Sequence, residues 1–281
     1  MAPTLLGRAL GRAIVLTAFL LSGARAAAAT RRIDVGGFRL NLRCEGEGSP
    51  VVVLDSGAGD TLGAWDWVVP DVKKVTRVCA YDRAGLGRSD RGPSPRNSER
   101  IVAELHQLLV RARIPPPYVL VGHSFGGLNV RLYAARHPTE AAALVLVDAT
   151  PEDYPGLAES LYSGIELEKL RTARAVAPLA FGDEIDAIAE SAASVRAAPV
   201  AATLPVTVLT AVHRGDSPEF RAAWTDLQRK MAESFPGAQQ IIAERSDHYI
   251  QFDEPELVVR AIREQVEAAR IAGARRSPPA P

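Results

Sequence analysis

The sequence predicts an α/β fold, with a mostly parallel central sheet and helices on both of its faces. Short apolar runs bounded by turn residues alternate with longer segments of helical period. The central runs are nearly all apolar, as strands buried on both faces must be. The 281 residues are 47% hydrophobic and 23% charged, an ordinary globular composition on a chain long enough to bury a sizeable core.

The apolar and helical patterns place each element along the chain. We expect strands at 38–44, 51–54, 77–81, 118–121, 143–147, 206–211 and 239–243, preceded by an edge strand at 32–35. Helices are expected at 98–112, 125–136, 218–234 and 256–272.

The amino terminus has the pattern of a secretory signal. Arg8 and Arg12 precede an apolar stretch at 13–21, and small residues follow at 24–28. The apolar stretch is shorter than the roughly 20 residues that span a bilayer. We therefore expect a signal peptide over residues 1–28, a secreted or periplasmic protein, and no stable membrane insertion after signal cleavage.

The remaining chain divides into a core, an insertion and a tail. The core is expected over residues 29–149 and 204–273. Residues 150–203 are Ala-rich, poor in strand signals and broken by prolines, which predicts a helical cap over one end of the sheet. Residues 274–281 have no apolar period and are expected to form a disordered tail.

Charge and cysteine content exclude several classes of partner. The 33 Lys and Arg residues balance 33 Asp and Glu residues, so the chain has no net field to attract a polyanion and no nucleic acid partner is expected. Two cysteines cannot form a four-ligand zinc site unaided, and we expect neither a metal nor a cofactor.

One short segment points to nucleophilic chemistry. The strand at 118–121 runs into Gly122-His123-Ser124-Phe125-Gly126-Gly127 and then directly into a helix, which is the G-x-S-x-G motif in its required context. Glycines are needed there because a serine on a strained strand-to-helix turn leaves no room for side chains around it. The motif predicts Ser124 as nucleophile and the Phe125 N–H as one oxyanion donor.

Together with two further segments, this motif makes the chain resemble the α/β-hydrolase superfamily. Residues 82–90, DRAGLGRSD, are similar to its D-R-x-G-x-G-x-S-D turn, and residues 246–249, SDHY, are similar to its terminal histidine loop. The resemblance covers nearly all of the chain after the signal segment and implies an α/β-hydrolase fold with a helical cap. We assign residues 82–90 a structural role, with Asp82 capping the turn.

Of five histidines, His248 is the expected general base. It follows the last strand, where the superfamily carries its base. His106 and His137 fall on helices, His213 falls in a loop, and His123 cannot easily fold back onto the adjacent serine.

The acid of the triad has two candidates. The resemblance implies a site nine residues beyond Pro205, but that position is Arg214, so the sequence departs from the superfamily there. Asp216 lies two residues later, and Asp148 directly follows the preceding strand, where some branches place the acid. We favour Asp148 over Asp216, because a carboxylate at a strand end is better immobilised for holding an imidazole.

Two further features follow from the resemblance. It places the second oxyanion donor in the loop at 55–60, where we assign the Ala58 N–H. Trp65 and Trp67 follow this loop and either line the pocket or pack a short helix against the sheet.

Cys44 and Cys79 fall on strands that are neighbours in the superfamily, so an exported protein is expected to join them in a disulfide, the alternative being two buried thiols.

These features together predict a secreted serine hydrolase, a carboxylesterase or lactonase acting on a small-molecule ester. Dehalogenases and epoxide hydrolases of this superfamily use an aspartate nucleophile, and Ser124 argues against both. Peptidase, cofactor-free haloperoxidase and carbon–carbon bond hydrolase activities keep the serine and remain alternatives. A ligand-binding protein without catalysis is the alternative from another class. The sequence carries no signal for substrate identity or oligomeric state.

Overall fold

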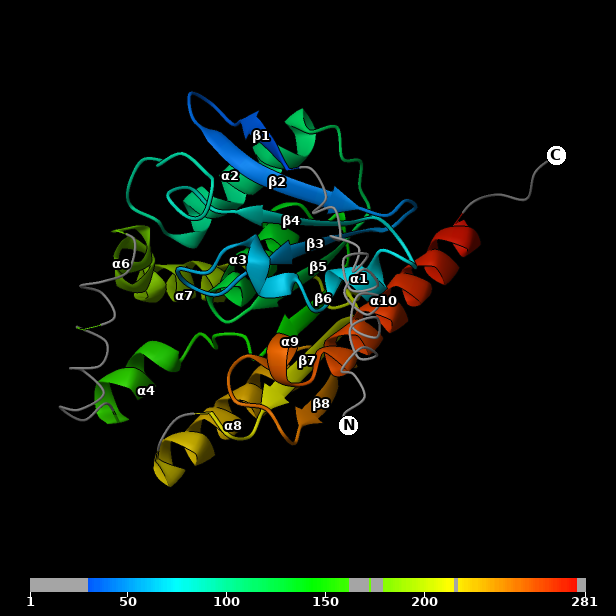
Figure 1. Ribbon diagram of the computed structural model, residues 1–281. Coiled ribbons are helices and arrows are strands. Elements are labelled where there is room, and N and C mark those ends of the chain that lie inside the picture. Colours follow the sequence, from blue (N-terminus) through cyan, green and yellow to red (C-terminus); the bar gives the residue numbers. More distant parts are fainter. Residues whose placement is uncertain (1–29, 162–171, 173–178, 215–216, 277–281) are drawn as a thin grey trace, which may run out of the picture.

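The computed structural model describes residues 30–161, 172, 179–214 and 217–276, and Figure 1 shows their arrangement. The strands of this part of the chain form one sheet in the order β1-β2-β4-β3-β5-β6-β7-β8. β2 pairs antiparallel with both β1 and β4, and every other neighbouring pair is parallel. The prediction of a mostly parallel sheet flanked by helices is confirmed.

All eight expected strands are present, with ends that differ from the expected ones by no more than two residues. They are β1 Arg31–Asp34, β2 Arg39–Glu45, β3 Val51–Asp55, β4 Val78–Asp82, β5 Tyr118–His123, β6 Ala141–Val147, β7 Val206–Ala211 and β8 Gln239–Ala243. β3, β4, β5 and β7 are buried along their whole length, which explains why an apolar run without alternation located them.

The four expected helices are also present, as α2 Ser98–Arg111, α3 Phe125–Arg136, α8 Pro218–Glu233 and α10 Pro255–Arg276. The side chains of Asn97 and Ser217 cap α2 and α8 by accepting from the backbone N–H three residues on. The short helices η1 Leu62–Trp65, α1 Val69–Val72 and α9 Ile250–Asp253 join them.

The expected tail at 274–281 requires a correction. α10 continues through Arg276, so residues 274–276 are helical, and residues 277–281 lie outside the described part of the chain. Alanine and arginine are good helix formers, and basic residues at a helix C-terminus interact favourably with its dipole. The single Gly273 does not end the helix.

The insertion is helical where it is described. It contains α4 Tyr154–Leu161, α6 Leu179–Asp186 and α7 Ile188–Ala197, which Figure 1 shows together at one end of the molecule. The expected signal peptide at 1–28 lies outside the described residues. No helix in the described ranges is both long and apolar enough to cross a membrane.

The core lies on both faces of the sheet. Along β5, Leu120 faces the cluster formed with α2 and α3, whereas Val119 and Val121 face the cluster formed with α1 and α10. This alternation is the two-residue period of a strand. The two layers of helices fix the sheet, and with it the positions of the loops that follow its strands.

Cys44 and Cys79 stand directly opposite one another on the antiparallel strands β2 and β4, and they form a disulfide. Both residues pack against the cluster under α2. The bridge closes a loop between cysteines 35 residues apart in sequence. It therefore fastens the antiparallel edge of the sheet to its parallel part.

We expect the double variant Cys44→Ala/Cys79→Ala to lose about 3 to 4 kcal/mol of unfolding free energy, because the unfolded chain regains the entropy of an open loop. Urea denaturation of the variant, compared with the oxidised wild type, measures this loss. Reductant should destabilise the wild type and leave the variant unchanged. Equal sensitivity of the two proteins to reductant would contradict the prediction.

Candidate active site

Ser124 lies on a strained turn between β5 and α3. Its backbone has φ 49° and ψ −119°, a left-handed conformation that a serine rarely adopts. The neighbouring glycines allow the turn to pack. A Cβ on Gly122 would lie 2.5 Å from the Gly126 carbonyl oxygen, and one on Gly126 would lie 2.3 Å from the Asp55 carbonyl oxygen. The partly exposed Ser124 side chain is thus held at the carboxyl end of the sheet.

His248 and Asp148 meet beside this turn, although they are 100 residues apart in sequence. The His248 Nδ1 lies 2.7 Å from the Asp148 Oδ2. Asp148 follows β6, the strand adjacent to β5, and its own φ is 40°. The structure therefore brings together the base and the favoured acid, while Asp216, the other candidate acid, lies outside the described residues.

The Asp148 carboxylate is fully buried and surrounded by donors. Its Oδ1 accepts from the Ala211 N–H at 3.1 Å and from the Trp224 Nε1 at 2.9 Å, and its Oδ2 accepts from Arg214 at 3.1 Å. Burial raises the pKa of Asp148 to about 6, while Arg214, Trp224 and Ala211 act in the opposite direction. The carboxylate is therefore mainly ionised at neutral pH.

Arg214 was not expected in the site. It stands where the resemblance placed an acid, and its guanidinium lies 3.7 Å from the centre of the Trp224 ring while contacting both Asp148 and His248 Nδ1. In the sequence, position 214 stands out only because it lacks the acid that the superfamily pattern implies. The tertiary structure shows in addition that Arg214 contacts an acid at the end of another strand.

His123 links the serine turn to the histidine loop. Its Nε2 donates to the His248 carbonyl oxygen at 3.0 Å, and the two rings lie 4.6 Å apart. Burial, reinforced by the charges of Arg214 and Arg83, lowers the pKa of His123 to about 3, so the ring is neutral. His123 is therefore a tether, a role that its place beside the serine did not reveal.

The two expected oxyanion donors are both available. Neither the Ala58 N–H nor the Phe125 N–H has a hydrogen-bond partner among the described residues. The loop that carries Ala58 packs against the serine turn at Gly126. Of the two tryptophans that follow, Trp65 is fully buried in the core and Trp67 is 68% exposed. Trp65 thus has the packing role.

One group of three potential metal ligands occurs in the described ranges, formed by His106, His137 and Glu140. The two imidazoles stack face to face, with centroids 4.1 Å apart and planes at 8°. An ion in the plane of one ring therefore lies outside the plane of the other, so the rings as placed do not converge on one ion. The group is also separated from Ser124 by the 12 residues of α3, about 18 Å.

The comparisons with known proteins agree with this fold. A family model described as the alpha/beta hydrolase fold matches residues 50–252. The chain belongs to the alpha/beta-hydrolase family. This membership confirms the superfamily implied by the serine turn and the histidine loop.

Relatives of this hydrolase include proteins with and without a described activity. An uncharacterised protein of Bacillus subtilis, YqjL, is 26% identical over 234 residues, which cover 83% of this chain and 89% of that protein. The 2-hydroxymuconate semialdehyde hydrolase of a Pseudomonas species is 36% identical over 128 residues, covering 44% of this chain and 45% of that protein.

Two solved structures illustrate the shared fold. The enol-lactonase from Burkholderia xenovorans superposes with a TM-score of 0.60 at 20% identity, covering 84% of this chain and all of that one. The bromoperoxidase from Bacillus anthracis superposes with a TM-score of 0.63 at 17% identity, covering 85% of this chain and all of that one. Such low identities establish the fold alone.

Replacing the acid tests the arrangement directly. We expect Asp148→Asn to slow the reaction of Ser124 with a fluorophosphonate probe by about 10³- to 10⁴-fold, because the amide cannot stabilise the imidazolium that forms as the serine is deprotonated. The rate of labelling measures this effect. Asp226→Asn, which alters an exposed carboxylate on α8, serves as control. Labelling of Asp148→Asn at the wild-type rate would exclude Asp148 as the acid.

The pH dependence of labelling tests Arg214. The Asp148 carboxylate must be ionised to stabilise the imidazolium, so the wild-type rate should fall as this carboxylate is protonated and the pH drops through about 6. In Arg214→Gln the carboxylate loses a stabilising charge, which raises its pKa, and the midpoint should move to higher pH. Arg214→Lys keeps the charge and should shift less. An unchanged midpoint in Arg214→Gln would contradict this assignment.

Proposed function

We propose that the protein is a serine hydrolase that cleaves carboxylic esters, a carboxylesterase or lactonase. The His248 Nε2 takes the hydroxyl proton of Ser124 as its Oγ attacks the ester carbonyl carbon. The Ala58 and Phe125 N–H groups stabilise the resulting oxyanion. His248 then gives the proton to the leaving alkoxide, and a water molecule activated by the same imidazole releases the acid from the acyl-enzyme.

The hydrogen bond between His248 and Asp148 carries this proposal. It engages Nδ1 of the imidazole, which leaves Nε2 for the nucleophile, and the buried carboxylate stabilises the imidazolium. The strained backbone of Ser124 gives further support, since such strain concentrates at functional sites.

Carbon–carbon bond hydrolysis is the second candidate. Both the 2-hydroxymuconate semialdehyde hydrolase and a meta-cleavage product hydrolase from Pseudomonas fluorescens are similar to this chain, the latter with a TM-score of 0.62 at 18% identity over 85% of this chain and 98% of that one. We favour esters because they need only the serine, the base and the oxyanion donors that the site offers.

We also propose that the enzyme works outside the cytoplasm, as a secreted or periplasmic protein. The signal pattern in residues 1–28 supports this location. The disulfide between Cys44 and Cys79 is a second support, because such bonds persist mainly in oxidising compartments.

Hydrolysis of a nitrophenyl ester series, from acetate to decanoate, tests the activity. We expect turnover by the wild type and a loss of at least about 10³-fold in Ser124→Ala, because no other group can form the acyl-enzyme. The preferred chain length reports the size of the acyl pocket. Ser94→Ala, which changes an exposed serine, serves as control.

Two outcomes would count against the proposal. Turnover that persists in Ser124→Ala would exclude this serine as nucleophile. A wild type that hydrolyses no ester but cleaves a vinylogous diketone would establish the carbon–carbon bond hydrolase instead, and inactivity toward both would favour a peptidase, a haloperoxidase or a binding role.

A further inference from the structure

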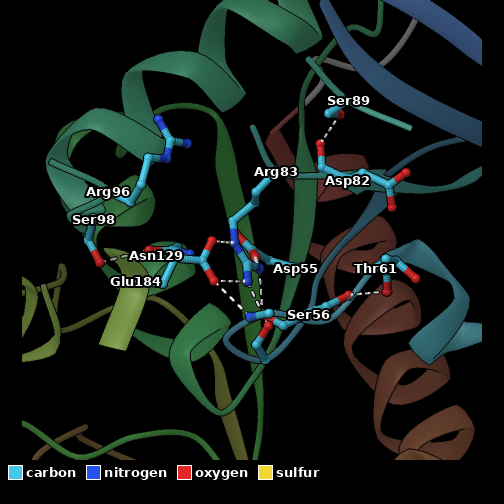
Figure 2. Close-up of polar contacts among 12 residues, drawn as sticks. Asp55, Ser56, Thr61, Asp82, Arg83, Ser89, Arg96, Ser98, Asn129 and Glu184 are labelled. Atoms are coloured by element: carbon cyan, nitrogen blue, oxygen red, sulfur yellow. Dashed lines mark hydrogen bonds and ion pairs between the residues drawn. The ribbon is translucent and has the colours of Figure 1, made fainter. Parts of the chain in front are cut away.

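Arg83 lies inside the protein with every donor of its guanidinium occupied. The Nε and Nη2 atoms donate to Glu184 Oε1 and Oε2 at 2.7 and 2.8 Å, and Nη1 donates to the Asp55 carboxylate at 2.7 Å. The remaining donors reach the carbonyl oxygens of Ser56 at 2.7 Å and Gly57 at 2.6 Å. Arg83 is 2% exposed, and Figure 2 shows it at the centre of these contacts.

The partner of this arginine belongs to the insertion rather than to the sheet. Glu184 lies on α6, more than 100 residues after Arg83 in sequence, and its side chain is fully buried. Its Oε2 also accepts from the Gly59 N–H at 2.9 Å. One carboxylate from the cap therefore holds both Arg83 and the loop at 55–60, hereafter the oxyanion loop.

These contacts determine which way the Gly57–Ala58 peptide faces. The Gly57 carbonyl oxygen accepts from Arg83 and from the Asp60 N–H at 3.0 Å. In a trans peptide the carbonyl and the next N–H point in opposite directions, so fixing the Gly57 oxygen on Arg83 turns the Ala58 N–H away from it. That N–H is one of the two expected oxyanion donors that have no partner among the described residues.

A second residue of α6 also packs against the oxyanion loop. Gly59 has φ +75°, and a Cβ there would lie 2.6 Å from the Phe181 ring on α6. On the sheet side, Gly126 packs against the loop backbone. The loop is thus enclosed between the serine turn, Arg83 and α6.

Charge keeps the arginine contact intact. Burial opposes the charged form of Arg83, but the neighbouring carboxylates of Glu184 and Asp55 hold its pKa well above the usual value. The guanidinium therefore stays charged, and a buried charge requires its partners to stay in place.

We propose that Arg83 and Glu184 are positioning residues, through which docking of the cap helix α6 sets the oxyanion loop so that the Ala58 N–H serves the serine. This inference rests on the proposed function. Arg83 lies in the turn at 82–90, and it would affect catalysis indirectly, by fixing the backbone of the oxyanion loop.

The test compares Glu184→Gln with a matched buried pair elsewhere. The side chain of Glu104 accepts from Arg96 through two bonds of 2.6 Å and is also buried, and within the described ranges it makes no hydrogen bond with the oxyanion loop. Glu104→Gln therefore controls for the general loss of a buried ion pair. Both variants should have lower melting temperatures than the wild type.

Only Glu184→Gln should affect the chemistry. We expect its kcat for a nitrophenyl ester, its rate of phosphonylation at Ser124 and its affinity for a trifluoromethyl ketone all to fall by about 10- to 100-fold, with KM changed by less than about threefold, because a misplaced donor weakens stabilisation of the tetrahedral state. Glu104→Gln should match the wild type in all four quantities.

If Glu184→Gln does not fold, Glu184→Asp replaces it. The aspartate keeps the charge that balances Arg83, but its carboxylate is one methylene too short to hold both the arginine and the Gly59 N–H, so a loss of several-fold in the same quantities is expected. Wild-type kcat and ketone affinity in the variant that folds, or an equal loss in Glu104→Gln, would overturn the proposal. A wild type that neither turns over esters nor reacts at Ser124 would instead overturn the proposed function on which it rests.

Discussion

The buried carboxylate of Asp148 is the constraint on which the rest of the site depends. Removing a carboxylate from water costs several kcal/mol unless charged and polar partners replace its hydration. Here those partners come from four separate places: the end of β7, the loop at Arg214, helix α8 through Trp224, and His248. Each of these segments must be in position for the charge to be tolerated. The hydrogen bonds that stabilise the Asp148 carboxylate therefore position His248 and also connect the second half of the chain to the end of β6.

A second constraint is the close approach of backbones around Ser124. Glycine at 126 lets the serine turn pack directly on the oxyanion loop, and glycine at 122 lets the turn close on its own backbone, because a Cβ at either position would collide. That loop is held from its other side by Arg83 and by Glu184 of the cap. Direct contacts thus connect the serine turn to the oxyanion loop, and the oxyanion loop to the cap. Through these contacts the insertion takes part in positioning the Ala58 N–H.

The sequence predicts structure best where local chemistry decides the outcome. Apolar runs mark the strands because each central strand is buried on both faces. A residue whose deciding partner is distant in sequence carries much less information. The sequence marks Arg214 only as a position that lacks the expected acid and places Arg83 in a turn with a structural role. Glu184 carries no local signal, because it is one of several acidic residues in its short helix. The expected end of α10 is too early, because the residues beyond 272 also favour a helix and their composition does not mark where the helix ends.

Residue spacing and backbone sterics within a few positions were enough to predict the order of the strands and main helices, the serine turn and the place of the histidine. Which groups share a site depends instead on the tertiary structure: the pairing of His248 with Asp148, the contact of Arg214 with both, and the hydrogen bond from the oxyanion loop to Glu184. The physical reason is that electrostatic partners are chosen by distance in space. A parallel sheet brings the carboxyl ends of distant strands to one edge, and no local pattern records which side chains meet there.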